Sequence, residues 1–372
     1  MNRTWNRRQF LKAGLAAGAL MGLPVAAWSA QQERLIVRSP RPQDFETPLE
    51  YLDSYLTPNE EFFVRSHFGP PVIDPKEWRL EFDGLIKSPR TMRLEDLKKF
   101  EIVTLPATLQ CAGNGRSLFK PAVPGAQWQY GAVGNAEWRG VRLSDVLNSL
   151  EVSPTAHHVQ LEGYDIAPMP TVPAFTRSIP LDRATAKNTL LAFEMNGEPL
   201  PVLHGGPLRL VVPGWAGENW TKWLRRITVQ ENEASGFYMQ TGYRIPDGNG
   251  SSTVPISAMP VKSLIARPIE NSSQTLAPLM IAGVAFTGTG SVTEVEVSTD
   301  NGMSWTKAEL EPQKSAGAWQ LWRYHWKPTT AGKYVIAARA TDSGGATQPD
   351  VTAWNKGGYL WNGIQRVTCE IQ

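Results

Sequence analysis

The chain has 372 residues, a length typical of a protein with two domains. Hydrophobic residues make up 41% and charged residues 19%, so the chain can bury a large core and is not a disordered polypeptide. The formal net charge is only +2, which excludes a strongly basic protein that binds nucleic acid or a membrane surface through its charge.

Residues 1–30 have the composition of an export signal. Arg7 and Arg8 precede Phe10-Leu11-Lys12, and residues 13–32 then form an uncharged run rich in alanine and glycine. A basic start, an apolar middle and small residues at the end are typical of such signals, and the paired arginines resemble a twin-arginine signal. An uncleaved run of this length could also anchor the chain in a membrane. We expect a twin-arginine signal peptide, export of the folded protein by the twin-arginine machinery, and a periplasmic location.

Residues 31–250 mix short strands with short helices. Residues 78–82 alternate between apolar and polar side chains and predict a strand that ends at Asp83-Gly84. Residues 94–100 and 141–147 predict helices, because their apolar residues fall on one helical face. Residues 208–212 predict a strand that turns at Pro213-Gly214, with residues 224–229 as its pairing partner. No helical period persists for long, so we expect an α+β domain.

After about residue 250 the composition changes to serine, threonine, valine and glycine. Residues 292–297 alternate cleanly and lead to a turn at Asp300-Asn301-Gly302, and residues 319–326 and 334–340 predict two more strands. Short strands at this spacing are typical of a β-sandwich. Residues 247–252 have turn chemistry, so we place a domain boundary there, between residues 31–250 and residues 251–372.

Cys111 is the residue with the strongest indication of chemistry. It begins a Cys111-Ala112-Gly113-Asn114-Gly115-Arg116 loop, in which small residues let the backbone approach a bulky ligand. A nearby arginine could lower the pKa of the thiol or bind an anion. The residues alone leave open a buried structural cysteine, or a disulfide with Cys369, the other cysteine of the chain. Two cysteines cannot hold an iron–sulfur cluster or a four-cysteine zinc site.

This loop resembles the molybdenum-ligand loop of the sulfite oxidase family of molybdopterin enzymes. Four other segments resemble parts of that family in the same order along the chain. They are residues 62–67 (its substrate-arginine segment), residues 204–209 leading to 222–224 (its pterin-phosphate region), residues 242–244 (its active-site tyrosine) and residues 295–305 (its immunoglobulin-like dimerisation domain). The resemblance implies an α+β molybdopterin-binding domain with the sulfite oxidase fold, followed by an all-β immunoglobulin-like sandwich.

The resemblance also implies a role for each matching residue. Cys111 would bind molybdenum through its thiolate, since a soft metal prefers a soft ligand. Arg65 and Arg116 would grip sulfite, because a planar guanidinium can bind two oxygens at once, with Tyr243 and Trp128 beside them. The residues expected to hold the molybdenum–molybdopterin cofactor are His67, Cys111, Gly113, Asn114, His204, Arg209 and Lys222.

The implied activity is oxidation of sulfite to sulfate at a molybdenum–molybdopterin centre, with electrons passed to an external acceptor, a c-type cytochrome. A homodimer is implied by the C-terminal domain. Animal members of the family carry an arginine at the position of Gly115 and an additional haem domain, so the chain is most similar to the bacterial haem-free periplasmic sulfite dehydrogenases. A further substrate arginine is expected near Lys356, whose role the sequence leaves open.

Three alternatives remain at this stage. Two are sister enzymes of the same fold, a sulfane dehydrogenase and a methionine-sulfoxide reductase. The third is a non-catalytic exported β-sandwich protein that binds a ligand without metal.

Overall fold

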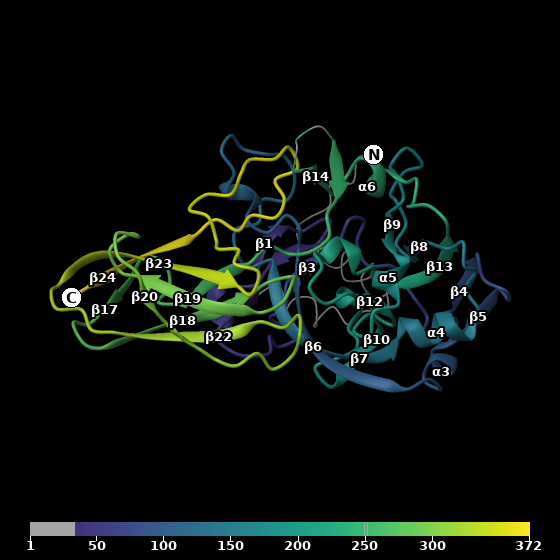
Figure 1. Cartoon of the computed structure of the whole chain (residues 1–372), viewed down its shortest axis with the longest axis horizontal. Helices are drawn as coiled ribbons and strands as arrows, with labels where there is room; N and C mark the ends of the chain where they lie inside the picture. Colours follow the sequence, from purple (N-terminus) through teal and green to yellow (C-terminus); the bar gives the residue numbers. More distant parts are fainter. Residues whose placement is uncertain (1–33, 249, 251) are drawn as a thin grey trace, which may run out of the picture.

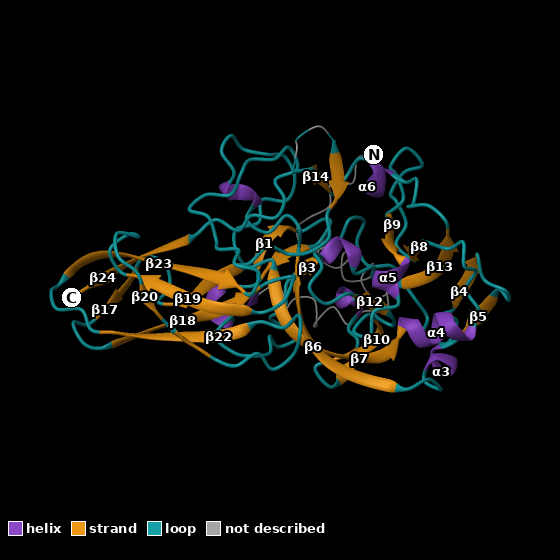
Figure 2. Ribbon diagram, viewed as in Figure 1, coloured by secondary structure: helices purple, strands orange, loops and turns teal. Residues whose placement is uncertain are grey.

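The computed structural model describes residues 34–248, 250 and 252–372, so the proposed signal peptide, residues 1–30, lies outside the described residues. Strands far outnumber helices in this part of the chain (Figure 2). Residues up to about 245 form one end of the molecule and the strands after residue 262 form the other (Figure 1). Among the described residues, none of the helices has the length and apolar character needed to cross a membrane.

The N-terminal part is built on two five-stranded sheets. The first has the order β11-β10-β7-β6, with β12 also paired to β10, and comprises β6 (Ile102–Gln110), β7 (Val133–Arg142), β10 (Leu190–Met195), β11 (Glu198–Pro199) and β12 (Arg209–Val211). The second has the order β5-β4-β13-β8-β9 and comprises β4 (Leu80–Gly84), β5 (Arg90–Met92), β8 (His158–Gly163), β9 (Thr176–Pro180) and β13 (Leu224–Gln230). One large hydrophobic cluster takes side chains from both sheets and forms the core of this part.

Smaller elements complete the N-terminal part. A three-stranded sheet contains β1 (Ile36–Ser39), β2 (Asp44–Glu46) and β3 (Val64–Arg65), and β14 (Arg244–Pro246) pairs with β15 (Thr253–Pro255). The α-helices are α3 (Leu94–Leu97), α4 (Leu143–Ser149), α5 (Leu181–Ala184) and α6 (Phe237–Gln240), and the 3-10 helices are η1 (Leu49–Tyr51), η2 (Arg116–Leu118), η3 (Val202–His204) and η4 (Gly217–Asn219).

The C-terminal part is a β-sandwich of two sheets. One sheet has the order β16-β18-β22-β21, with β16 (Lys262–Arg267), β18 (Leu279–Phe286), β21 (Glu309–Leu310) and β22 (Gln320–Trp326). The other has the order β17-β24-β23-β19-β20, with β17 (Ser272–Gln274), β19 (Val292–Ser298), β20 (Thr306–Lys307), β23 (Gly332–Asp342) and β24 (Gln365–Ile371). Alternate side chains of β19, including Val295 and Val297, enter the core between the sheets.

The expected α+β domain followed by an all-β sandwich is confirmed. The alternating strand at β19 and its turn are also confirmed, since Asn301 and Gly302 have φ angles of 62° and 89°. Such positive angles suit asparagine and glycine, and they explain why this dipeptide turns the chain. The predicted boundary at residues 247–252 falls in the turn between β14 and β15 and stays a prediction.

Three local predictions were wrong or only partly right. The helix expected at residues 141–147 begins at Leu143, because Val141 and Arg142 still pair as the end of β7. The helix expected at 94–100 is a single short turn, α3. Strand β13 does not pair with β12; it lies between β4 and β8, while β12 pairs with β10.

The two parts are joined by a further hydrophobic cluster. It contains Ala112, beside Cys111, together with Tyr243 and side chains of the sandwich such as Leu264 and Trp319. The cysteine loop is therefore packed between the two parts of the molecule.

We expect that Trp138→Ala lowers the free energy of unfolding by about 3–5 kcal/mol, because the side chain is fully buried and its loss leaves a large cavity. The indole also donates a hydrogen bond of 3.1 Å to the carbonyl of Ala107. Chemical denaturation followed by fluorescence would measure the change. The control is Ile166→Ala, at a side chain that is 83% exposed, for which the midpoint should barely move. Equal shifts for the two variants would contradict the assignment of Trp138 to the core.

Candidate functional site

One cavity of the described structure collects most of the residues predicted from the sequence. It measures roughly 730 Å³ including its open mouth, and its wall carries both buried cations and aromatic rings. The predicted residues that line it are Arg65, His67, Cys111, His204, Arg209, Lys222 and Tyr243. The predicted residues outside its wall are Gly113, Asn114, Arg116 and Trp128.

Cys111 follows the last residue of β6 and is held by backbone hydrogen bonds on both sides. Its N–H donates to the carbonyl of Ala132 at 2.9 Å, and its own carbonyl accepts from the N–H of Asn114 at 2.9 Å. Burial raises the pKa of the Cys111 thiol, although the charges of Arg65 and Arg116 oppose that shift. Cys111 and Cys369 are both free, so the disulfide considered above does not form. A free thiol on a cavity wall can become a metal ligand by releasing its proton when the metal binds.

Arg116 is not among the residues that line the cavity, and its predicted place beside the substrate stays a prediction. Its side chain is buried, and it donates to the carbonyls of Gly357 at 3.1 Å and Ala126 at 3.3 Å. The guanidinium also lies 5.1 Å from the ring centre of Tyr359. A Cβ at Gly113 would lie 2.7 Å from this guanidinium, so the glycine makes room for Arg116. In this structure, Arg116 fastens the cysteine loop to a segment near the C-terminus.

That C-terminal segment, residues 355–361, covers the cysteine loop. The N–H of Leu360 donates to the carbonyl of Ala112 at 2.8 Å. Gly115 has a φ angle of 92°, and a Cβ there would lie 2.5 Å from Trp361, so this position requires glycine for two reasons. Lys356 is exposed and is absent from the cavity wall.

Arg65 stands on β3 at one side of the cavity. Its Nη1 donates to the carboxylate of Asp44 at 2.9 Å and also to the carbonyl of Ser66. The side chain of Asp44 is buried, so this ion pair fixes the guanidinium. Among the described residues, the hydrogen bonds of this guanidinium use Nη1, so the other donors of its five N–H groups can bind a ligand.

Lys222, His204 and Arg209 form a buried group of nitrogen donors at the same cavity. The Nζ of Lys222 donates to the carbonyls of Arg65 at 2.7 Å and Leu203 at 3.1 Å. Arg209 donates to the carbonyls of His204 at 2.7 Å and Trp220 at 3.2 Å. Among the described residues, neither Lys222 nor Arg209 has a hydrogen-bonded carboxylate, which is unusual for buried basic side chains.

The charges of this group depend on burial. Burial lowers the pKa of Arg209 to about 9 and that of His204 to about 3, so near neutral pH the arginine is charged and the histidine is not. Burial, together with repulsion from Arg209, also holds the pKa of Lys222 well below its ordinary value. An anion bound beside Lys222 would raise its pKa again, because an opposite charge favours the protonated amine.

His67 and Tyr243 meet on the cavity wall. Their Nε2 and hydroxyl oxygen lie 2.7 Å apart in a hydrogen bond, and the His67 ring stacks on Phe175 with 4.3 Å between ring centres. Burial, with the charges of Arg65 and Lys222, holds the pKa of His67 well below its usual value. Burial likewise raises the pKa of Tyr243, so its hydroxyl keeps its proton. The pair is therefore neutral and can offer a hydrogen bond to a ligand.

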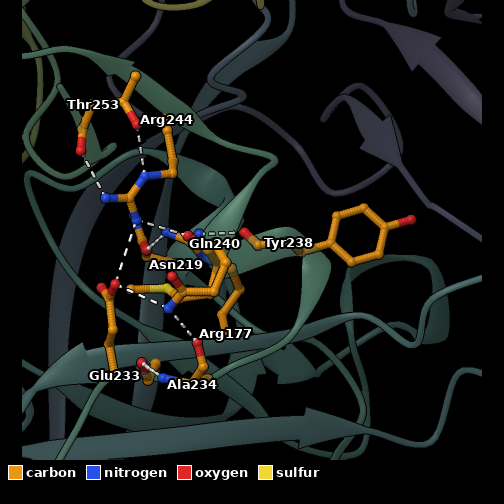
Figure 3. A network of polar contacts seen from close by, with 10 residues as sticks. Arg177, Asn219, Glu233, Ala234, Tyr238, Gln240, Arg244 and Thr253 are labelled. Atoms are coloured by element: carbon orange, nitrogen blue, oxygen red, sulfur yellow. Dashed lines mark hydrogen bonds and ion pairs between the residues drawn. The ribbon is translucent and has the colours of Figure 1, made fainter. Parts of the chain in front are cut away.

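Tyr243 has a φ angle of 53°, which is uncommon outside glycine. A network of polar contacts holds the neighbouring residues in place (Figure 3). The next residue, Arg244, donates to the carbonyls of Thr253 at 2.7 Å and Met239 at 2.9 Å. Arg177 donates to the carbonyl of Tyr238 at 2.5 Å and to the side chain of Asn219 at 2.9 Å. Its guanidinium lies 5.8 Å from the ring centre of Tyr243. The contacts of Arg244 and Arg177 thus support the unusual backbone angle of Tyr243.

Trp128 and Asn114 lie behind the wall. Trp128 is fully buried and packs edge-on against Phe63, which does line the cavity. The amide of Asn114 donates to the carbonyl of Tyr130 at 2.9 Å and accepts from the N–H of Ala132 at 3.1 Å. Both residues shape the cavity from outside it.

Sequence reasoning missed several polar residues on the wall. Glu218 is 7% exposed, its Oε2 has no hydrogen-bond partner among the described residues, and burial raises its pKa to about 7. The Oγ1 of Thr221 is buried and likewise unpartnered. Burial also raises the pKa of Asp165 to about 6. The only sequence signal was the position of Glu218 and Thr221 inside an aromatic and glycine-rich stretch that already resembled a cofactor region.

These observations fit an anionic cofactor that carries a soft metal. Buried basic side chains that are bonded to neutral oxygens, as Lys222 and Arg209 are, can bind a phosphate, since charged donors favour such oxygens. The unpartnered Thr221 hydroxyl gives a further polar group for a ligand to bind. Cys111, a free thiol on the same wall, is the donor type that molybdenum accepts.

Comparison with protein families gives three matches along the chain. Residues 67–238 match the oxidoreductase molybdopterin binding domain, and residues 253–372 match the Mo-co oxidoreductase dimerisation domain. Residues 6–24 match the twin-arginine translocation pathway signal sequence. The protein is therefore exported in the folded state by the twin-arginine route, which in bacteria leads to the periplasm.

Individual relatives agree with these matches. The mitochondrial sulfite oxidase of Homo sapiens is 38% identical, over 92% of this chain and 67% of its own length, so this chain spans about two thirds of that protein. The sulfite oxidase of Arabidopsis thaliana is 32% identical, over 91% of this chain and 94% of its own. Among solved structures, the sulfane dehydrogenase SoxCD from Paracoccus pantotrophus superposes with a TM-score of 0.80 at 30% identity, covering 93% of this chain and 90% of that one.

The fold, the cavity and these relatives lead to one classification. The protein is an oxidoreductase that uses a molybdenum–molybdopterin cofactor. The chain belongs to the sulfite oxidase family.

Proposed function

We propose that the protein oxidises sulfite to sulfate and passes the electrons to a c-type cytochrome in the periplasm. The observation that carries this proposal is the cavity in which a free cysteine thiol shares a wall with a fixed arginine and a neutral tyrosine–histidine pair. Sulfite is a small oxyanion, and such a ligand needs forked cationic donors and one or two hydrogen-bond donors. Relatives named sulfite oxidase support the choice of substrate.

The cofactor would supply oxygen-atom transfer and the storage of two electrons, while the protein supplies binding and orientation. Cys111 would hold the metal through its thiolate. Lys222, Arg209 and His204 would hold the pterin phosphate, because they form the buried donor group that lacks carboxylate partners. Loss of water from this cavity on binding would strengthen each of these electrostatic contacts.

At the substrate end, Arg65 would bind two oxygens of the anion, and its ion pair with Asp44 would keep the guanidinium plane in place. Tyr243 would donate its hydroxyl hydrogen to the anion. Its hydrogen bond with His67 would then be kept with His67 as the donor, or released. Trp128 would shape the pocket through Phe63. Arg116, Gly113 and Asn114 would act through the shape of the cysteine loop, since their contacts lie within that loop and its cover.

A second candidate activity is sulfane dehydrogenation. It is favoured by one observation, the superposition on a sulfane dehydrogenase at a TM-score of 0.80. We also propose that the protein is a homodimer formed through residues 253–372, because this segment matches a dimerisation domain.

We expect that the purified, molybdenum-loaded protein reduces cytochrome c when sulfite is added. Parallel assays would use ferricyanide as the acceptor, and thiosulfate in place of sulfite. Sulfite turnover with ferricyanide but not with cytochrome c would contradict the proposed acceptor. A molybdenum-loaded protein that oxidises thiosulfate and leaves sulfite unchanged would contradict the proposed substrate and favour the sulfane activity.

We expect that Cys111→Ser abolishes sulfite oxidation, because a hard alkoxide replaces the soft thiolate beside the metal. Steady-state assays with ferricyanide would measure the loss, and elemental analysis would report the molybdenum content. Cys369→Ser is the matched control, since Cys369 lies buried in the sandwich core, away from the cavity wall. Full sulfite turnover by Cys111→Ser would remove Cys111 from the metal site.

We expect that Arg65→Gln raises the KM for sulfite by about 10- to 100-fold, the range that loss of a charge-assisted hydrogen bond allows. The molybdenum content should change far less, because Arg65 faces the substrate in the proposed arrangement. Arg65→Lys keeps the charge but not the fork, so an intermediate KM is expected. An unchanged KM in the glutamine variant, with normal molybdenum content, would exclude Arg65 from the substrate site.

A further inference from the structure

Lys262 is a fully buried lysine at the start of β16, in the C-terminal sandwich. Its Nζ donates to the Oε1 of Gln110 at 3.1 Å, across the boundary between the two parts of the molecule. Burial lowers the pKa of Lys262 to about 7, opposed only by the distant charge of Glu46. Glu46 is itself occupied, since its carboxylate accepts hydrogen bonds from Arg38 and from the backbone N–H groups of Gln129 and Gly131.

The partner of Lys262 stands directly before Cys111. Gln110 Oε1 also accepts a hydrogen bond of 3.1 Å from the side-chain amide of Asn114, three residues after Cys111. Asn114 in turn holds the carbonyl of Tyr130 and the N–H of Ala132. One oxygen of Gln110 therefore ties together the two ends of the cysteine loop, and Lys262 fixes that oxygen from the other domain.

Fold stability does not explain this lysine. A buried lysine whose hydrogen-bond partner among the described residues is one neutral amide costs free energy, and an apolar side chain of similar volume is often neutral or stabilising in its place. The surroundings supply apolar contacts, because Leu264 and Ala266, which alternate with Lys262 along β16, belong to the cluster that joins the two parts. A residue that costs free energy of folding and lies next to a functional loop indicates a role in positioning that loop.

We propose that Lys262 is the positioning residue through which the C-terminal sandwich fixes the Cys111 loop in the conformation that presents its thiol to the cavity. The inference deepens the proposed function, because its consequence for the enzyme rests on Cys111 as the metal ligand. The residue acts through Gln110, directly before the loop, while residues 355–361 bond to the loop itself at Ala112 and Arg116.

The test is hydrogen exchange of backbone amides in the full-length holoenzyme, with Lys262→Met as the main variant. Methionine keeps an unbranched apolar stem but lacks the terminal nitrogen of lysine, so it cannot donate to Gln110. We expect exchange of the amides of residues 111–116 to become about tenfold faster, as loss of one buried hydrogen bond allows. The amides of β19, in the sandwich core, should keep their wild-type rates.

Two further variants make the result specific. Ser263→Ala changes the next, equally buried residue of β16, whose backbone N–H donates to Gln348, and should leave the loop amides unchanged. Gln110→Leu removes the acceptor of both Lys262 and Asn114 and should give at least the same local increase. Adding Lys262→Met to Gln110→Leu should change little, because Gln110→Leu already removes the contact of Lys262. If Lys262→Met cannot be purified, unchanged loop exchange in Gln110→Leu would overturn the proposal.

Unchanged loop exchange in a folded Lys262→Met protein would overturn the proposal. An equal rise at β19 would also overturn it, since Lys262 would then support the whole domain and not the loop. The measurement uses no sulfite and no electron acceptor. A failure of the sulfite assay therefore leaves this result standing, and a failure here leaves the proposed activity standing.

Discussion

Buried basic side chains that have no hydrogen-bonded carboxylate among the described residues are the constraint on which the site depends. Arg209 and Lys222 are taken out of water and bonded to main-chain carbonyls, which offset only part of the cost of desolvation. A bound anion would supply the missing charge, so the cavity is built for an anionic group before any ligand arrives. Arg65 differs from these two because Asp44 compensates its charge, and it is therefore held in place independently of a ligand. The site therefore contains two kinds of basic side chain. An anion would offset the burial of Arg209 and Lys222, whereas Asp44 already holds Arg65 in place to bind one.

The cysteine loop is held by contacts from both parts of the molecule. Its residues follow β6, but Leu360 and Gly357 bond to it, and Lys262 bonds to Gln110 directly before it. Tyr243 also contacts both parts, since its ring stacks on Tyr359 at 5.3 Å and its hydroxyl bonds to His67. The segment that matches a dimerisation domain thus also contributes contacts to the cysteine loop. Any movement between the two parts would change the shape of that loop.

The sandwich strands could be predicted from the sequence because their pattern is local. Alternation along β19 places every second side chain in the core, and the following Asn-Gly pair turns the chain whatever lies around it. The pairing of β13 could not be predicted in this way. Its neighbours β4 and β8 are far away along the chain, and the choice between them and β12 depends on how the two sheets pack. The helix after β7 began late for the same reason, since pairing with β10 holds Val141 and Arg142 in the strand.

The sequence by itself determined the chemical types at the site: a cysteine in a glycine-rich loop, separate arginines, a tyrosine and a lysine–histidine set, each in a recognisable segment. It also determined the export signal, because that signal is recognised from its local pattern of charged, apolar and small residues. Only the tertiary structure decided which of these side chains face one cavity. Arg116 lies outside the cavity wall and bonds to Gly357, and Trp128 packs against Phe63. Glu218 and Thr221 line the cavity, and Lys262 bonds to Gln110 beside Cys111. The physical reason is that burial and hydrogen-bond partners are set by residues remote in sequence, and these decide which way a charged side chain points.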